Sequence, residues 1–131
     1  MNHFKFEKMI YEIAFASSDG ENVNEHFGRA KRFYKALIDT ELDDYDIGGY
    51  VDVTPSCHGG EHEVSAFGDT AEILGGISAV VVQRAGPGAV KYMEEQGIKV
   101  YQIPLTIEQA LCLLMEEKQW EVDRWRSHTK N

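Results

Sequence analysis

Alternating apolar and polar positions predict the first strand of this chain at residues 11–16, which runs into a polar turn at 17–20. Residues 32–39 and 46–54 are rich in aromatic and β-branched side chains, as strands are. The acidic segment 40–45 between them has a length that suits a hairpin, so we expect these two strands to pair antiparallel.

The second half of the chain alternates between helical and strand patterns. A helical pattern covers residues 66–74 and ends at a glycine pair, as helices often do. Residues 79–82 are a continuous apolar run typical of a central strand covered on both faces. A helix at 89–96 and a strand at 98–103 then complete a βαβ unit.

The last predicted helix begins after Thr106, which has capping-box spacing to Gln109. Its apolar positions fall on one stripe and predict a helix that runs beyond Lys118: Ile107, Ala110, Leu111, Leu114, Val122 and Trp125. Cys112 is interpreted as an inert buried thiol, and Trp120 and Trp125 as cover for apolar surface. The C-terminal tail is expected to dock on the sheet.

A right-handed βαβ crossover beside an antiparallel hairpin predicts an α/β fold with a mixed sheet of five strands and helices on both faces. At 131 residues the chain has the length of one domain, so we expect a single domain over 1–131. Within it we distinguish an N-terminal extension at 1–10, a core at 11–117 and a C-terminal helix extension or tail at 118–131.

The charge and the apolar content of the chain limit its possible binding partners. The net charge of −9 opposes binding to nucleic acid or to an anionic membrane, because both depend on Lys and Arg side chains that neutralise phosphates. No stretch approaches the roughly 20 apolar residues of a membrane span, and residues 1–10 lack the pattern of a secretory signal. We therefore expect a cytoplasmic protein, in which Cys57 and Cys112 stay reduced.

Three polar segments next to strand ends contain the candidate chemistry. The first covers residues 17–29 and holds His26, whose imidazole suits a soft or borderline metal. The alternative is a surface or turn-capping histidine. The second is the run Cys57-His58-Gly59-Gly60-Glu61-His62, in which a thiolate and two imidazoles could ligate a metal. One cluster of ligands does not make a closed zinc site, so an open or partial site with His26 fits better.

The third segment follows the central strand. Gly86 and Gly88 permit a sharp turn, Pro87 suits the first helical position, and the free amides of a helix start attract anions. The pattern lacks the lysine and the glycine spacing of nucleotide-binding loops. A tight turn without a ligand is the alternative interpretation.

Three stretches in this order resemble the dinitrogenase iron-molybdenum cofactor family, from about residue 11 to about residue 117: IAFASSDGENVNEHFGRAKRFY at 13–34, CHGGEH at 57–62 and RAGPGAVKYMEEQGIKVY at 84–101. The resemblance implies a three-layer α/β/α, ribonuclease-H-like fold with strand order 3-2-1-4-5 and strand two antiparallel. It further implies binding or carriage of an iron-sulfur or iron-molybdenum cluster without catalysis, with His26 as the leading ligand and Cys57, His58 and His62 in a region that varies among members.

In that strand order, strands one and four are adjacent and parallel, so the His26 loop should meet the turn at Gly86 and Gly88. Arg29 and Arg84 would then place positive charge beside an anionic cluster. A protein partner in cofactor assembly is expected, and the oligomeric state stays open.

Two other functions remain under consideration. One is a metal-free regulatory or interaction module. The other is a metal-dependent nuclease on a ribonuclease-H-like scaffold, which needs clustered carboxylates. Asp19 and Asp39 are its candidate members, but we expect them at opposite ends of their antiparallel strands.

Overall fold

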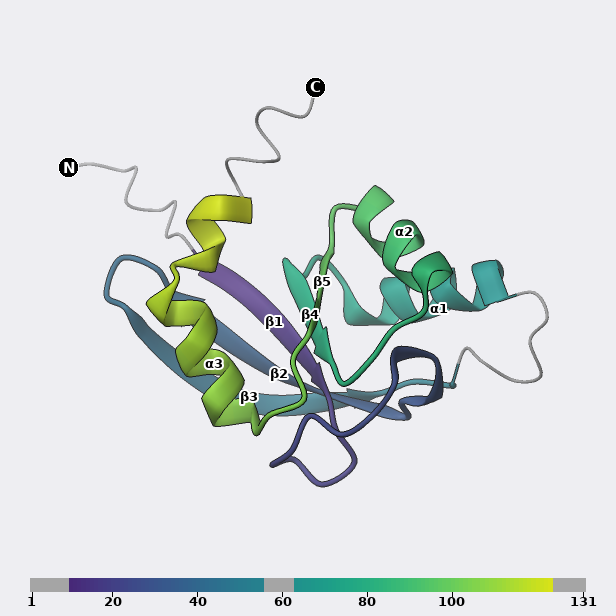
Figure 1. The fold of residues 1–131 in the computed structure, drawn as a ribbon, viewed down its shortest axis with the longest axis horizontal. Coiled ribbons are helices and arrows are strands. Elements are labelled where there is room, and N and C mark those ends of the chain that lie inside the picture. Colours follow the sequence, from purple (N-terminus) through teal and green to yellow (C-terminus); the bar gives the residue numbers. More distant parts are fainter. Residues whose placement is uncertain (1–9, 56–62, 124–131) are drawn as a thin grey trace.

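The centre of the molecule is a five-stranded sheet, seen in a computed structural model that describes residues 10–55 and 63–123 (Figure 1). Its strands, in chain order, are β1 (Ile10–Ala16), β2 (Arg32–Asp39), β3 (Asp44–Asp52), β4 (Ala79–Val82) and β5 (Lys99–Gln102). They lie in the order β3-β2-β1-β4-β5, which confirms the order that the family resemblance implies.

Strand directions follow from the connections. β1 pairs antiparallel with β2 and parallel with β4, and β5 continues the parallel part beside β4. β2 is antiparallel to both of its neighbours, as expected. The β2–β3 hairpin turns over residues 40–43, whose acidic side chains are mostly exposed.

Helices cover both faces of this sheet, which gives three layers (Figure 1). The helices α1 (Glu63–Leu74) and α2 (Pro87–Glu95) pack with one core, and α3 (Ile107–Glu116) packs with the other. Period-two alternation along β1 divides its side chains between these cores, with Ile13 in the α3 core and Ala14 in the other.

The end of α3 differs from the expected long helix. α3 stops at Glu116, Lys118 adopts a φ of 47°, and a separate helical stretch follows at 119–123. This left-handed residue breaks the periodicity, so Trp120 is buried with 4% exposure while Val122 lies outside at 38%. The predicted stripe is therefore wrong at Val122, and Trp125 lies outside the described residues.

The helical stretch 119–123 docks on the sheet through Asp123. The hydroxyl groups of Tyr11 and Tyr101 both donate hydrogen bonds to the Asp123 carboxylate. Burial, together with this carboxylate, raises the pKa of both tyrosines above the usual range. The chain beyond α3 thus packs on the sheet as far as it is described, as we expected of the tail.

Cys112 corrects a second expectation. Its thiol lies on the exposed side of α3, one position after the buried Leu111, so it is not a buried core thiol.

Within the two described ranges, no helix combines the length and the apolar character needed to cross a bilayer.

Candidate functional site

The loop after β1 and the turn after β4 run side by side at the carboxyl end of the sheet. His26 and Arg84 form an isolated parallel bridge. The Phe27 N–H donates to the Arg84 carbonyl at 2.9 Å, and the Gln83 N–H donates to the Glu25 carbonyl at 2.9 Å. The two segments predicted to meet are therefore joined by backbone hydrogen bonds.

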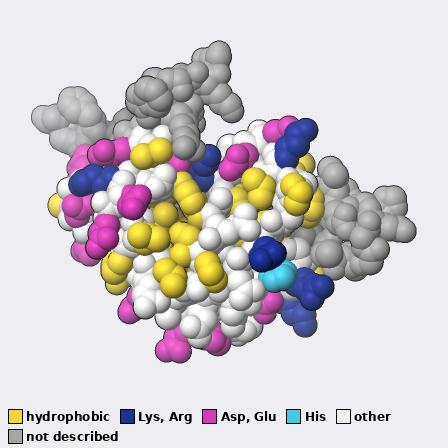
Figure 2. Space-filling view, in the orientation of Figure 1, with side chains coloured by type: hydrophobic (Ala, Val, Ile, Leu, Met, Phe, Trp, Pro, Cys, Tyr) yellow, Lys and Arg dark blue, Asp and Glu magenta, His cyan; other side chains and the backbone are white. Residues whose placement is uncertain are grey.

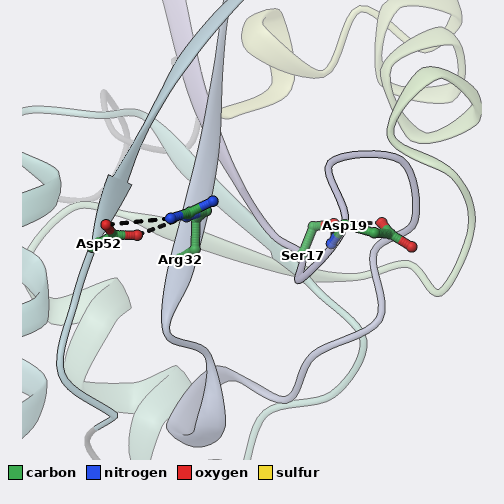
Figure 3. Close-up of polar contacts among 4 residues, drawn as sticks. All are labelled: Ser17, Asp19, Arg32 and Asp52. Carbon is green, nitrogen blue, oxygen red and sulfur yellow. Dashed lines mark hydrogen bonds and ion pairs between the residues drawn. The ribbon is translucent and has the colours of Figure 1, made fainter.

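A compact polar turn leads from β1 into this loop. The buried Ser17 Oγ accepts the Gly20 N–H at 2.9 Å, and the Asp19 Oδ1 accepts the N–H groups of Glu21 and Asn22, each at 2.8 Å. Ser17 and Asp19 lie close together in Figure 3. These hydrogen bonds, above all those from Asn22, hold the pKa of the Asp19 carboxyl well below its usual range.

The same loop is tied to the start of α3. The Val23 N–H donates to the Leu105 carbonyl at 2.9 Å, and the Ile107 N–H donates to the Glu21 carbonyl at 2.8 Å. Val23 is buried in the α3 core, and Thr106 caps α3 in the predicted capping box with Gln109. Because both ends of the loop are held, its backbone path is fixed by neighbours distant in sequence.

His26 itself is exposed, and its side chain does not cap the short 3-10 turn η2 (Phe27–Arg29) that follows. Of the alternative interpretation, a surface or turn-capping histidine, the surface position agrees with the structure and the capping role does not. Arg29 and Arg84 are exposed as well. In Figure 2 the histidine of the described ranges lies between Lys and Arg side chains. An imidazole and several cations thus share one surface.

The glycine turn supplies backbone groups to the same end. Gly86 caps α2, Pro87 occupies its first turn, and Gly86 and Gly88 are both exposed, with nothing within 4 Å of an added Cβ. The N–H groups of Gly88 and Ala89 have no intrahelical acceptor, because they belong to the first turn. In contrast to these two groups, the N–H of Ala85 has an acceptor: it donates a hydrogen bond to Gln102 Oε1 at 3.1 Å.

The remaining predicted ligands, Cys57, His58 and His62, lie outside the described residues. The chain leaves the described part beside the site, since the Val53 N–H donates to the Lys31 carbonyl at 2.9 Å, and it returns at the start of α1. Among residues 10–55 and 63–123, no group of three His, Cys, Asp or Glu side chains could hold a metal ion. Of the four predicted metal ligands, the described ranges contain His26.

Sequence reasoning missed two contributors at this end. Lys31 adds a further exposed cation between η2 and β2, and no motif distinguishes it from an ordinary surface lysine. Arg32 forms an ion pair with Asp52 at 2.7 Å across β2 and β3, visible in Figure 3 as dashed lines, and lies 3.8 Å from the Tyr50 ring centroid. The ion pair could be predicted only with the β2–β3 register in hand, because it depends on Arg32 and Asp52 facing each other at the ends of their strands.

The two candidate carboxylates of a nuclease, Asp19 and Asp39, do not lie together in the described part of the chain. Asp39 pairs with Ile10 at the amino end of β1, whereas Asp19 follows the carboxyl end. The expectation that they lie at opposite ends is confirmed, which removes the pair that supported nuclease chemistry.

Known proteins similar to this chain indicate its family. The family model for dinitrogenase iron-molybdenum cofactor matches residues 9–117. The FeMo cofactor biosynthesis protein NifB of Sinorhizobium fredii is 33% identical over 88 residues, which are 67% of this chain but only 17% of that protein. An uncharacterised protein of Methanocaldococcus jannaschii is 27% identical over 101 residues, covering 76% of this chain and 82% of the relative.

A solved structure shows the same fold. The apo form of the orange protein from Desulfovibrio gigas superposes with a TM-score of 0.58 at 25% identity, covering 84% of this chain and 91% of that one. Because the family model spans most of the chain, the resemblance seen in the sequence is confirmed. The chain belongs to the dinitrogenase iron-molybdenum cofactor family.

Proposed function

We propose that this chain binds an iron-sulfur or iron-molybdenum type cluster as cargo and carries it without catalysing a reaction. Family membership and the similarity to a segment of a FeMo cofactor biosynthesis protein support this role. In this proposal the three-layer α/β/α fold is a ribonuclease-H-like scaffold that serves binding. The cluster is exchanged with a separate protein partner in cofactor assembly.

The observation that carries the proposal is the bridge between His26 and Arg84. It places an exposed imidazole, a good ligand for iron and other transition metals, beside a guanidinium group. A cluster that contains its own sulfides needs few protein ligands. A site with His26 as its one described ligand therefore suits a cluster better than a bare metal ion. One or two protein ligands also leave the cargo exchangeable.

The surroundings of His26 fit an anionic cargo. Arg29 and Arg84 provide positive charge, and the turn at Gly86 and Gly88 leads to amides that can donate to sulfide or oxygen atoms. These contacts lie outside the metal coordination sphere. They orient the cluster and compensate the net charge of −9 that would otherwise repel it.

Cys57, His58 and His62 are proposed as the second source of ligands, on the strength of their donor chemistry. A thiolate from this segment would ligate a metal at another position of the cluster. His26 remains the first ligand in this assignment.

Anaerobic reconstitution tests the proposal. We expect wild-type protein incubated with iron, sulfide and molybdate under reducing conditions to retain metal after desalting and to show visible charge-transfer absorption. His26→Ala and Cys57→Ala should each reduce both signals, whereas Gln96→Ala, at the exposed end of α2, should not. Wild-type protein without metal would instead indicate a metal-free interaction module, and unchanged loading in both variants would remove the assigned site.

A further inference from the structure

Four aromatic side chains meet beneath the candidate site. Phe27, directly after His26, is 2% exposed, and its ring centroid lies 6.1 Å from that of Phe33 and 5.8 Å from that of Phe67. Phe67 in turn lies 6.1 Å from Tyr92. The contacts join η2, β2, α1 and α2 on one face of the sheet.

Two of these rings lie next to described parts of the candidate site, and a third joins them. Phe27 follows His26 in the chain, and Tyr92 lies in the helix that begins after the Gly86 turn. These segments are far apart in sequence. Phe67 contacts both rings.

The helices that hold two of the rings approach closely. A Cβ added at Gly68, the residue after Phe67, would lie 3.1 Å from the Tyr92 hydroxyl oxygen. This spacing is tighter than an ordinary Cβ contact, so a side chain at that position would require the Tyr92 hydroxyl to move by a few tenths of an ångström. The two helices therefore approach closely at Gly68 and Tyr92. The Phe27 and Phe67 rings meet edge to face at 64°, the arrangement that aromatic pairs prefer.

We propose that Phe67 is a positioning residue for the cluster site, acting through Phe27. This inference rests on the proposed function. The edge-to-face contact between Phe27 and Phe67 holds the backbone next to His26 against α1, and the contact between Phe67 and Tyr92 extends this constraint to α2, which begins at the Gly86 turn. A site assembled from separate loops keeps its geometry only if the elements below it are held together by packing.

The test compares three variants of the full chain. Phe67→Leu removes the ring but keeps an apolar side chain, and Phe67→Tyr restores a ring at a position with 9% exposure. Leu111→Ala destabilises the other core, on the α3 face, and serves as the control for general loss of stability. Urea denaturation establishes the stability of each variant, and anaerobic cluster titration, followed by visible absorption, gives its affinity.

We expect Phe67→Leu to weaken cluster binding about ten-fold, the size of effect that residues behind a metal ligand have. Phe67→Tyr should bind within about two-fold of wild type, and Leu111→Ala should do the same despite its lower stability. Wild-type affinity in Phe67→Leu, or an equal loss in Leu111→Ala, would overturn the inference.

A cluster-free measurement separates this inference from the proposed function. The ring signals of His26, identified by their loss in His26→Ala, should shift in NMR spectra of Phe67→Leu and stay in place in Leu111→Ala. A wild-type protein that binds no cluster would refute the proposed function. Unshifted His26 signals in Phe67→Leu would refute the positioning role, whatever the protein binds.

Discussion

At the carboxyl end of β1, irregular loops present exposed basic side chains, whereas at its amino end a tight hairpin presents acidic ones. The first group is Arg29, Lys31 and Arg84 beside His26. The second is Glu41, Asp43 and Asp44 in the β2–β3 turn. These three cations lie where the family resemblance predicts the cargo, in a loop region that also exposes Asp19 and Glu21.

The two ends also differ in how their backbones are held. The hairpin turn is local, with the Asp43 N–H bonded to the Asp39 carbonyl at 2.9 Å. The carboxyl end is instead tied together across the sequence, by Phe27 to Arg84 and by Val23 to Leu105. A local turn can tolerate change without affecting other elements, while a loop held by distant partners transmits changes between them. This difference suits a binding site at the carboxyl end.

Charge neutralisation at the two ends gives the largest expected contrast. Arg29→Gln combined with Arg84→Gln should weaken cluster binding by about 10- to 100-fold, because contacts behind the metal ligands contribute that much to affinity. Anaerobic titration at low and high salt measures the effect, and the wild-type affinity should fall as salt rises.

The matched control neutralises two acids in the hairpin, Glu41→Gln with Asp44→Asn. These side chains are exposed at the far end of the sheet, so we expect less than about a two-fold change in affinity, in keeping with salt screening over that distance. Equal effects at both ends would mean that net charge, and not the local arrangement, governs binding.

Two glycines allow the backbones of the ends to be compared directly. Gly20 in the carboxyl-end loop and Gly75 after α1 both have a φ of 79°. Alanine at either position should cost about 1–2 kcal/mol of unfolding free energy, the usual cost of a left-handed residue with a side chain.

Gly20→Ala should cost more, because its Cβ would lie 3.1 Å from the Tyr34 ring, while the space at Gly75 is open. The Tyr34 ring would have to shift, and its contact with the Tyr50 ring, at 5.4 Å between centroids, would change with it. Urea denaturation of both variants measures the difference, and equal losses would show that the Tyr34 contact yields without cost.

Local sequence patterns were sufficient for most of the fold. Period-two alternation located β1, the apolar run gave β4 at Ala79–Val82, and the Thr106–Gln109 spacing gave the start of α3. Chirality rules predicted a mixed five-stranded sheet, and the family resemblance implied its strand order. Adjacency of the parallel strands then predicted that the His26 loop meets the Gly86 turn.

What the sequence did not predict depends on tertiary packing. Nothing local indicates that Lys118 turns left-handed, yet this single residue places Trp120 in the core and Val122 at the surface. The exposure of Cys112, by contrast, was available from the sequence, because residue 112 does not belong to the apolar stripe that α3 buries. The contact between Phe27 and Phe67 joins residues far apart in the chain and becomes visible only in the assembled layers.

Capping at the start of α3 should matter more than the ion pair beyond its end. Thr106→Ala removes the acceptor of the Gln109 N–H, now bonded at 3.0 Å, and should cost about 1 kcal/mol of stability. Lys118→Ala breaks an exposed pair with Asp43 at 3.7 Å and should cost about 0–1 kcal/mol. Thermal unfolding of the two variants measures both losses. A larger loss in Lys118→Ala than in Thr106→Ala would show that the cap of α3 contributes less than the exposed ion pair.

The smallest effect is the acid dependence contributed by Asp19. Hydrogen bonds from Asn22 and Glu21 lower the pKa of this exposed carboxyl in the folded state below its value of 3.8 in an unfolded chain. The ionised form therefore stabilises the fold at pH values above about 4, and that contribution is lost as the pH falls further.

Asp19→Asn should remove this part of the pH dependence. Asn22→Ala keeps the backbone donor and loses the side-chain bond at 3.0 Å, so its pH dependence should lie between those of wild type and Asp19→Asn. Thermal midpoints measured from pH 6 down to pH 2.5 give the three slopes. Identical slopes would mean that the turn after β1 does not depend on the Asp19 charge, and that the carboxyl end is held by its backbone hydrogen bonds to Arg84 and Leu105 alone.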